Sequence, residues 1–238
     1  CKSGQRTLKM EASTVLKLNG LAKRFGSILA NDDVTIHLQK GEVLALLGEN
    51  GAGKTTLMNM LFGHYLPDSG NIEIKSVNDD FVPLELGNPS AALTAGIGMV
   101  HQHFTLAENI TAFENITLGA EPLFSLRRNQ RKAEKKINNI MSNSGLEAPL
   151  DIPVGRLSVG ERQRVEILKA LYRDAHILVL DEPTAVLTPQ EADALFSNLR
   201  RMTSHGLSVI FITHKMREVL AFSDRLVLLR HGKNVGSM

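Results

Sequence analysis

The stretch Gly48-Glu-Asn-Gly-Ala-Gly-Lys54-Thr55 decides the fold. A glycine, four residues and then Gly-Lys-Thr form the pattern of a phosphate-binding loop, or P-loop. The loop follows a predicted strand, Glu42 to Leu47, and precedes a predicted helix, Lys54 to Phe62, whose apolar residues recur on one face. Glycines let backbone N–H groups turn toward a phosphate chain, and the helix N-terminus adds a favourable dipole. We expect a nucleotide-binding loop made of Gly48, Glu49, Asn50, Gly51, Ala52, Gly53, Lys54, Thr55 and Thr56.

Two side chains of this loop are expected to carry the chemistry. The Lys54 ammonium would reach the β and γ phosphates, and the Thr55 hydroxyl would ligate Mg²⁺. The alternative is a glycine-rich turn that only joins a strand to a helix. The Lys-Thr pair, with a strand before it and a helix after it, favours the phosphate site.

An acidic pair follows a second apolar strand, Ile177 to Leu180, 127 residues after Lys54. A carboxylate at the carboxyl end of a buried strand lies where α/β sheets bind ligands. We expect Asp181 to hold Mg²⁺ through water, and Glu182 to accept a proton from the attacking water or to orient it. The alternative is that this acidic pair is only the solvated end of a strand. Its position 127 residues after Lys54 favours the metal-binding and catalytic interpretation.

Short strands and helices alternate at both ends of the chain, which predicts an α/β fold with parallel strands joined by crossovers. Between about residues 105 and 170 strand patterns are few, which indicates a helical insert. Besides those named above, the predicted strands are Val15 to Leu18, Val34 to Leu38, Asn71 to Ile74, Ile97 to Val100, Ser208 to Ile212 and Leu226 to Leu229. The predicted helices are Leu126 to Met141, Gln190 to Met202 and Met216 to Phe222.

Composition restricts the class of protein. The 238 residues are 43% hydrophobic, which suffices for a folded core, and the net charge is only +2, which disfavours a general nucleic-acid binder. No apolar run approaches the roughly 20 residues of a membrane-spanning helix, and Cys1 to Ala12 lacks the apolar stretch of a secretory signal. A single cysteine excludes a disulfide within the chain and fits a reducing compartment.

Further motifs choose among the classes of P-loop protein. Leu157-Ser-Val-Gly-Glu161 lies just before Asp181-Glu-Pro-Thr184, Gln102 lies between the P-loop and that motif, and His214 follows the strand Ser208 to Ile212. This ordered set resembles the nucleotide-binding domain of ATP-binding cassette (ABC) proteins over Val15 to Gly236. The resemblance implies an α/β P-loop NTPase fold of the ABC type, with a parallel-sheet core, an antiparallel β region and a helical subdomain.

The resemblance also implies a domain organisation. Residues 14–238 would form one ABC ATPase domain, in which 14–103 and 166–238 are the α/β core with the antiparallel region and 104–165 are the helical subdomain. Residues 1–13 would be an N-terminal extension, with a vector origin as one explanation.

The same resemblance implies roles for individual residues. Phe25, in place of the usual Tyr, would stack on adenine, and Gln102 would contact Mg²⁺ and the membrane domain. His214 would contact the γ-phosphate and help to fix the water. The implied catalytic residues are Glu182, His214 and Lys54, and the implied metal-binding residues are Thr55, Gln102 and Asp181.

The motif at Ser158, Val159, Gly160 and Glu161 matches the signature that caps the γ-phosphate of ATP bound to a second cassette. Val159 and Glu161 replace the commoner Gly and Gln. Ser158 is also expected to cap a helix N-terminus, and the two interpretations are compatible. Thr188 stands where the family's D-loop usually has Asp.

Two pairs of segments narrow the resemblance. The first is His101-Gln-His-Phe with Glu114-Asn-Ile-Thr-Leu-Gly-Ala-Glu-Pro122, and the second is Leu157-Ser-Val-Gly-Glu161 with Asp181-Glu-Pro-Thr-Ala-Val-Leu-Thr188. They look like the N-terminal cassette of bacterial import ATP-binding proteins for simple sugars or nucleosides, of the ribose, galactose and purine-nucleoside type. Members of that group carry two cassettes in one chain, so this sequence looks like a fragment or a separately made first half.

That resemblance implies an ATPase that uses ATP and Mg²⁺ to power import at the cytoplasmic face of the inner membrane, as a peripheral protein. Its partners would be a second nucleotide-binding cassette, transmembrane permease subunits and, indirectly, an extracytoplasmic solute-binding protein, with no nucleic acid. The main alternative is a non-transport ABC ATPase of the translation-factor type. Chromosome-maintenance and DNA-repair ATPases insert long coiled coils, whereas only 103 residues separate Lys54 from Leu157. A regulator without hydrolysis is disfavoured by the presence of Glu182 and His214.

Overall fold

The computed structural model describes residues 14–76, 78–102, 104–120 and 126–238, and the side chains from residue 130 onward in the last of these ranges. A four-stranded antiparallel sheet has the order β2-β1-β4-β5. Its strands are β1 (Thr14–Phe25), β2 (Ile28–Gln39), β4 (Ser69–Lys75) and β5 (Phe81–Pro83). This is the antiparallel β region that the resemblance stated above implies.

A second sheet of six strands has the order β10-β9-β3-β8-β7-β6. Strands β9, β3, β8, β7 and β6 run parallel to one another, and β10 pairs antiparallel with β9. Parallel pairing brings the carboxyl ends of these strands to one edge, where α/β sheets bind ligands. The strands are β3 (Val43–Leu47), β6 (Ile97–Val100), β7 (Ile177–Asp181), β8 (Ser208–Thr213), β9 (Arg225–Arg230) and β10 (Lys233–Ser237).

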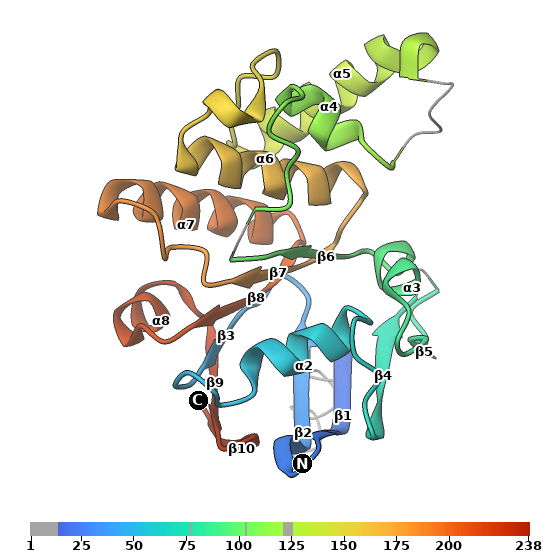
Figure 1. The fold of residues 1–238 in the computed structure, drawn as a ribbon, viewed down its shortest axis with the longest axis vertical. Helices are drawn as coiled ribbons and strands as arrows, with labels where there is room; N and C mark the ends of the chain where they lie inside the picture. Colours follow the sequence, from blue (N-terminus) through green and yellow to red (C-terminus); the bar gives the residue numbers. More distant parts are fainter. Residues whose placement is uncertain (1–13, 77, 103, 121–125) are drawn as a thin grey trace, which may run out of the picture.

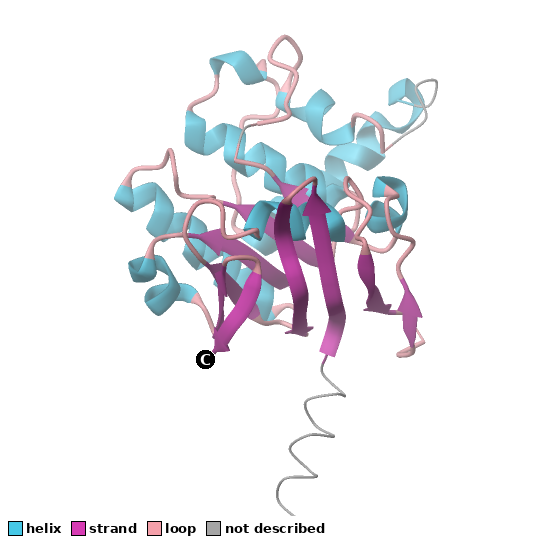
Figure 2. Cartoon of the chain, turned by 60° about the horizontal axis from the view of Figure 1, so that its bottom comes forward, coloured by secondary structure: helices cyan, strands magenta, loops and turns pink. Residues whose placement is uncertain are grey.

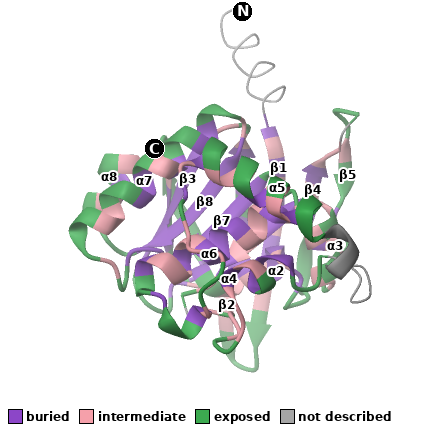
Figure 3. Cartoon of the chain, turned by 90° about the horizontal axis from the view of Figure 1, so that it is seen from above, coloured by how far each residue is buried: buried purple, intermediate pink, exposed green. Residues whose placement is uncertain are grey.

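The central strands form the core because they are apolar on both faces. Every residue of β3, β7 and β8 is buried, as expected for parallel strands that are covered on both sides (Figure 3). Helix α2 (Lys54–Leu61) lies between the two sheets, and its apolar side chains share one cluster with β1, β2 and β3 (Figure 1). This packing fixes the start of α2, and therefore the P-loop, against both sheets.

Helices cover the opposite face of the six-stranded sheet (Figure 2). A second apolar cluster joins that face to α7 (Pro189–Ser204), where Phe196 stacks on Phe222 with ring centroids 3.7 Å apart. Helices α4 (Ala112–Thr117), α5 (Leu126–Ser144) and α6 (Val159–Tyr172) lie at the far end of the molecule, with the 3₁₀ turn η1 (Val154–Arg156) before α6 (Figure 1). Two short helices complete the fold, α3 (Pro89–Thr94) and α8 (Met216–Phe222).

The structure confirms the predicted fold class and most predicted elements. The strand Ile97–Val100 and the helix Met216–Phe222 have the predicted bounds. The sequence did not indicate β5, α3, α4 or β10, because each has six residues or fewer and little periodicity. The predicted subdomain boundary after residue 165 falls inside α6, which is continuous from Val159 to Tyr172.

The predicted N-terminal extension, residues 1–13, lies outside the described residues. Among the residues that are described, no helix is both long enough and apolar enough to span a bilayer.

Candidate ATP-binding site

The P-loop folds around its own lysine. It runs from the carboxyl end of β3 to α2, and Gly53 is the N-cap of that helix with a φ of 98°. The Lys54 ammonium is buried and donates to the carbonyl oxygens of Gly48 and Glu49, at 2.6 and 2.8 Å. Burial lowers the pKa of Lys54, while the nearby carboxylates of Glu182 and Asp181 act in the opposite direction.

Segments far away in the sequence hold the loop in place. The Asn31 side-chain amide in β2 donates to the Gly53 carbonyl at 3.3 Å, and the Gly232 amide in the β9–β10 turn donates to the Ala52 carbonyl at 3.1 Å. A Cβ atom on Gly53 would lie 2.3 Å from the Ala30 carbonyl oxygen. Only glycine fits there. Neither Asn31 nor Gly232 was singled out from the sequence, because neither belongs to a motif.

The acidic pair lies where the sequence places it. Asp181 is the last residue of β7 and is 8% exposed. Burial is the main reason that its pKa is raised, and the Glu182 carboxylate raises it further, while Lys54 opposes the shift. Glu182 has a φ of 47°, and its amide donates to the Ile212 carbonyl of β8 at 3.0 Å. This bond ties the catalytic candidate to the neighbouring strand.

His214 completes a group of four. It follows β8, and its Nδ1 lies 2.9 Å from Oε1 of Glu182. Lys54, Asp181 and Glu182 interact electrostatically with one another. The structure therefore brings together four residues from the carboxyl ends of the adjacent strands β3, β8 and β7. These four can bind phosphate, hold a cation and take a proton from water.

The residues present suit a nucleotide with Mg²⁺. The first N–H groups of α2 have no side-chain cap, so they are available to an anion. Two neighbouring carboxylates, Asp181 and Glu182, share one buried ammonium, and a divalent cation would offset their repulsion. The predicted metal ligands Thr55, Gln102 and Asp181 offer only oxygen donors, which Mg²⁺ prefers.

Phe25 lies at the end of β1 and exposes 43% of its surface. Its ring meets Tyr65 edge to face, with centroids 5.4 Å apart, and the Lys23 ammonium lies 5.6 Å from its centroid. An exposed aromatic face of this kind can stack on a base.

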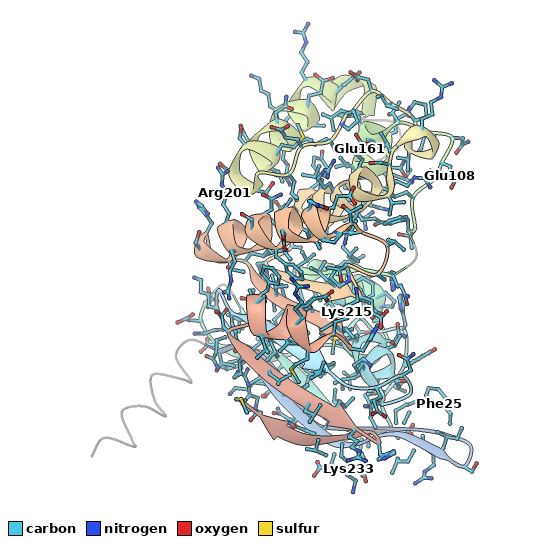
Figure 4. All side chains as sticks on the ribbon, turned by 90° about the vertical axis from the view of Figure 1, so that its left-hand side faces the viewer. Phe25, Glu108, Glu161, Arg201, Lys215 and Lys233 are labelled. Atoms are coloured by element: carbon cyan, nitrogen blue, oxygen red, sulfur yellow. The ribbon has the colours of Figure 1, made fainter. Side chains whose placement is uncertain are left out.

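The signature residues lie in the helical part of the molecule, at the start of α6. Figure 4 shows Glu161 there and Phe25 at the other end of the molecule. Ser158 is the N-cap of α6, as the sequence predicts, and it forms a capping box with Glu161. The Glu161 carboxylate accepts from the Ser158 amide and hydroxyl, both at 2.8 Å, and these bonds lower the pKa of Glu161. Glu161 therefore stabilises the helix start.

The signature lies close to the start of α7 and to the loops that carry Gln102 and Val186. A Cβ atom on Gly160 would lie 2.7 Å from Oε1 of Glu191, which forms a capping box with Thr188 at the start of α7. Thr188 is thus a helix N-cap. Gln102, the signature residue Val159 and Val186 line one pocket of about 240 Å³.

Comparisons with known proteins agree with this architecture. The family profile described as ABC transporter matches residues 31–185. A nucleoside import ATP-binding protein of Lactococcus lactis subsp. cremoris is 44% identical over 96% of this chain, and the match covers 44% of that protein. A glucose import ATP-binding protein of Haloferax volcanii is 42% identical over 96% of this chain and 46% of its own length. A ribose import ATP-binding protein of Hahella chejuensis is 43% identical over 94% of this chain and 44% of its own length.

Solved structures give the same result for the fold. The crystal structure of a nucleotide-free ATP-binding cassette from an ABC transporter superimposes with a TM-score of 0.80 at 27% identity, covering 94% of this chain and 90% of that one. The ADP conformation of the ATP-binding cassette MJ1267 gives the same values.

The fold and the site together define an ATP-binding cassette, a P-loop protein that binds ATP or ADP. The chain belongs to the ABC transporter family. It spans a little less than half the length of the curated relatives it matches.

Proposed function

We propose that this chain is the ATP-binding and ATP-hydrolysing first cassette of an importer for a simple sugar or a nucleoside. The names of the relatives support import of this solute class, since they describe nucleoside, glucose and ribose import, and they give no support to a translation factor. The observation that carries the ATPase assignment is the pairing of Glu182 with His214 beside the P-loop lysine. Permease subunits and a solute-binding protein would complete the importer, with the cassette held peripherally at the cytoplasmic face of the membrane.

ATP binding uses the loop and the exposed aromatic. Adenine stacks on Phe25, and the phosphates lie on the N–H groups at the start of α2. Lys54 exchanges its two carbonyl partners, Gly48 and Glu49, for the β and γ phosphates. Because the ammonium is already buried beside the loop, this exchange needs only a short movement of its end.

Hydrolysis uses the residues at the strand ends. Thr55, Gln102 and Asp181 would hold Mg²⁺, which when bound offsets the negative charge of the phosphates. Glu182 accepts a proton from the attacking water or orients it, and His214, bonded to Glu182 through Nδ1, contacts the γ-phosphate.

The signature completes a partner's site. Glu161 lies far from Phe25, at the other end of the molecule (Figure 4). The signature residues Ser158, Val159, Gly160 and Glu161, at the start of α6, would therefore cap the γ-phosphate of ATP on a second cassette. Ser158 would then turn its hydroxyl from Glu161 to the phosphate. Two copies, or this cassette and a second one, would enclose ATP between them and exclude water.

The variant Glu182→Gln tests the catalytic assignment. Loss of the carboxylate should lower kcat by about 10²- to 10⁴-fold, the usual contribution of a general base, which is about 3 to 5 kcal/mol in activation free energy. ATP binding should persist, because the phosphate contacts come from the P-loop. Steady-state hydrolysis and binding of a fluorescent ATP analogue measure both. The exposed Glu147→Gln is the matched control, and normal turnover in Glu182→Gln would refute the assignment.

A mixing experiment tests the shared site. Ser158→Ala removes the signature hydroxyl but leaves Glu182, whereas Glu182→Gln leaves the signature intact. Each variant alone should hydrolyse ATP slowly. Their mixture should recover activity, because a mixed dimer has one site with both groups. If the mixture is no more active than the separate variants, the signature does not act across two cassettes.

A further inference from the structure

A carboxylate outside the nucleotide-binding motifs joins the two loops that carry the hydrolytic pair. Glu218 lies in the first turn of α8, and its side chain is 13% exposed. Its Oε1 accepts a hydrogen bond from the Thr184 hydroxyl, and its Oε2 accepts from the Thr213 hydroxyl at 2.9 Å. The two threonines are 5% and 2% exposed. One carboxylate thus satisfies two buried hydroxyl groups from different strand ends.

The two threonines that Glu218 bonds are close in sequence to Glu182 and His214. Thr184 comes two residues after Glu182, beyond the end of β7, and Thr213 directly precedes His214 at the end of β8. The Glu182 carboxylate and His214 Nδ1 are 2.9 Å apart. Glu218 therefore bonds one threonine next to each member of the pair, Thr184 near Glu182 and Thr213 beside His214.

One ammonium and two hydroxyl donors surround the Glu218 carboxylate. The Lys215 ammonium lies 3.2 Å from Oε1 and also donates to the Thr184 hydroxyl at 3.3 Å (Lys215 is labelled in Figure 4). The Thr213 hydroxyl accepts from the Lys215 amide at 3.0 Å, so its proton is directed to Glu218. Hydrogen bonds to an ionised acceptor are about twice as strong as neutral ones. A glutamine would offer one acceptor oxygen in place of two and would place an N–H donor against a hydroxyl.

A second polar contact fixes the same loop from the other side. The Gln163 side-chain amide in α6 is 4% exposed and donates to the Pro183 carbonyl. Pro183 lies between Glu182 and Thr184. The loop is thus held by α6 through its backbone and by α8 through a hydroxyl, which leaves Glu182 little freedom.

We infer that Glu218 is a positioning residue for ATP hydrolysis, which holds the Thr184 and Thr213 loops in register so that Glu182 and His214 stay paired. This inference rests on the proposed ATPase function. Glu218 does not belong to the P-loop, so its loss should lower kcat and leave ATP affinity unchanged. Displacing a reacting group by about 1 Å can cost about a hundredfold in rate.

The test compares kcat and KM for ATP in Glu218→Gln, Thr184→Val and Thr213→Val. We expect kcat to fall at least tenfold in Glu218→Gln and several-fold in each threonine variant, with KM and the Kd for ATP within twofold of the wild type. The matched control is Glu42→Gln, which alters a buried carboxylate bonded to Arg225 and to the Gln39 amide, before β3 and away from the site. This control should reduce stability without lowering kcat.

A double-mutant cycle separates positioning from general loss of stability. If Glu218 acts through the two hydroxyls, Glu218→Gln should add little to a Thr184→Val, Thr213→Val background. Unchanged kcat, a rise in KM alone, or fully additive losses would overturn the inference. The threonine variants keep the side-chain volume, so they test the same contacts if Glu218→Gln folds poorly.

A spectroscopic signal tests the inference without hydrolysis. The ¹⁵N chemical shift of His214 Nδ1 reports its hydrogen bond to Glu182 and can be assigned by its loss in His214→Gln. It should change in Glu218→Gln and stay constant in Glu42→Gln; a constant value in both variants refutes the inference. A wild type that binds ATP but does not hydrolyse it would refute the proposed function alone, because the His214 signal still decides the role of Glu218.

Discussion

Alanine substitutions at two P-loop glycines, Gly51 and Gly53, measure how much the close contact between the loop and β2 contributes to stability. Gly51 and Gly53 both have positive φ angles, 80° and 98°. A Cβ atom on Gly51 would meet nothing within 4 Å, whereas one on Gly53 would lie 2.3 Å from the Ala30 carbonyl oxygen and 2.8 Å from the Asn31 side-chain nitrogen. Alanine at either position costs about 1 to 2 kcal/mol for the left-handed conformation. Only Gly53→Ala adds a clash, with a backbone atom that cannot rotate away.

The added cost sets the expected difference. Forcing extra volume into a packed site costs about 1 to 3 kcal/mol, so Gly53→Ala should be less stable than Gly51→Ala by about 2 kcal/mol. For a chain of this size that is a difference in Tm of about 4 to 8 °C. Thermal unfolding measures it, and titration with a fluorescent ATP analogue should show a larger loss of affinity in Gly53→Ala. Equal Tm values for the two variants would refute the clash as the reason for glycine at this position.

Two further predictions concern protonation and charge. Burial lowers the pKa of His176 in the folded chain. As the pH falls, the unfolded chain therefore binds a proton at a higher pH than the folded chain does, and stability should be lost below about pH 6.5. His176→Gln should therefore lose less Tm than the wild type between pH 7.5 and 5.5, and equal losses would contradict this. Glu161→Gln should let ATP bring two cassettes together at lower protein concentration, because it removes a negative charge beside Ser158. The concentration dependence of ATPase activity measures this; Glu114→Gln, in the capping box of α4, is the control, and a matching shift in that control would count against the charge at the signature.

Contiguous motifs made part of the site predictable. The P-loop and α2 follow from eight consecutive residues, and Asp181 and Glu182 follow from an apolar strand that ends in two carboxylates. Each prediction needs only local geometry, because the order of strand, loop and helix fixes where these side chains point. The fold class was predictable for the same reason.

Long-range contacts were not predictable in this way. Asn31 bonds the P-loop from 22 residues away, and Glu218 bonds Thr184 from 34 residues away. Such pairs depend on which strands become neighbours, and a single sequence does not give that order. One signal was available, since Ser158 and Glu161 have the Ser-x-x-Glu spacing of a capping box, which explains the glutamate in the signature.

The register of the parallel sheet fixes the P-loop, the acidic pair and His214 in place, whereas the signature at the start of α6 is held by its own capping box. Leu47 pairs with Thr213 and Asp181 with Ile212, so the P-loop, the acidic pair and His214 all leave the sheet at one edge. A slip of one residue in β8 would reverse the faces of its side chains and separate His214 from Glu182. The start of α6, in contrast, is already satisfied by its own Glu161. We propose that this rigid edge supplies phosphate binding and proton transfer. The signature would have to break its capping box to reach a phosphate, which favours contact with the signature only after ATP has brought two cassettes together.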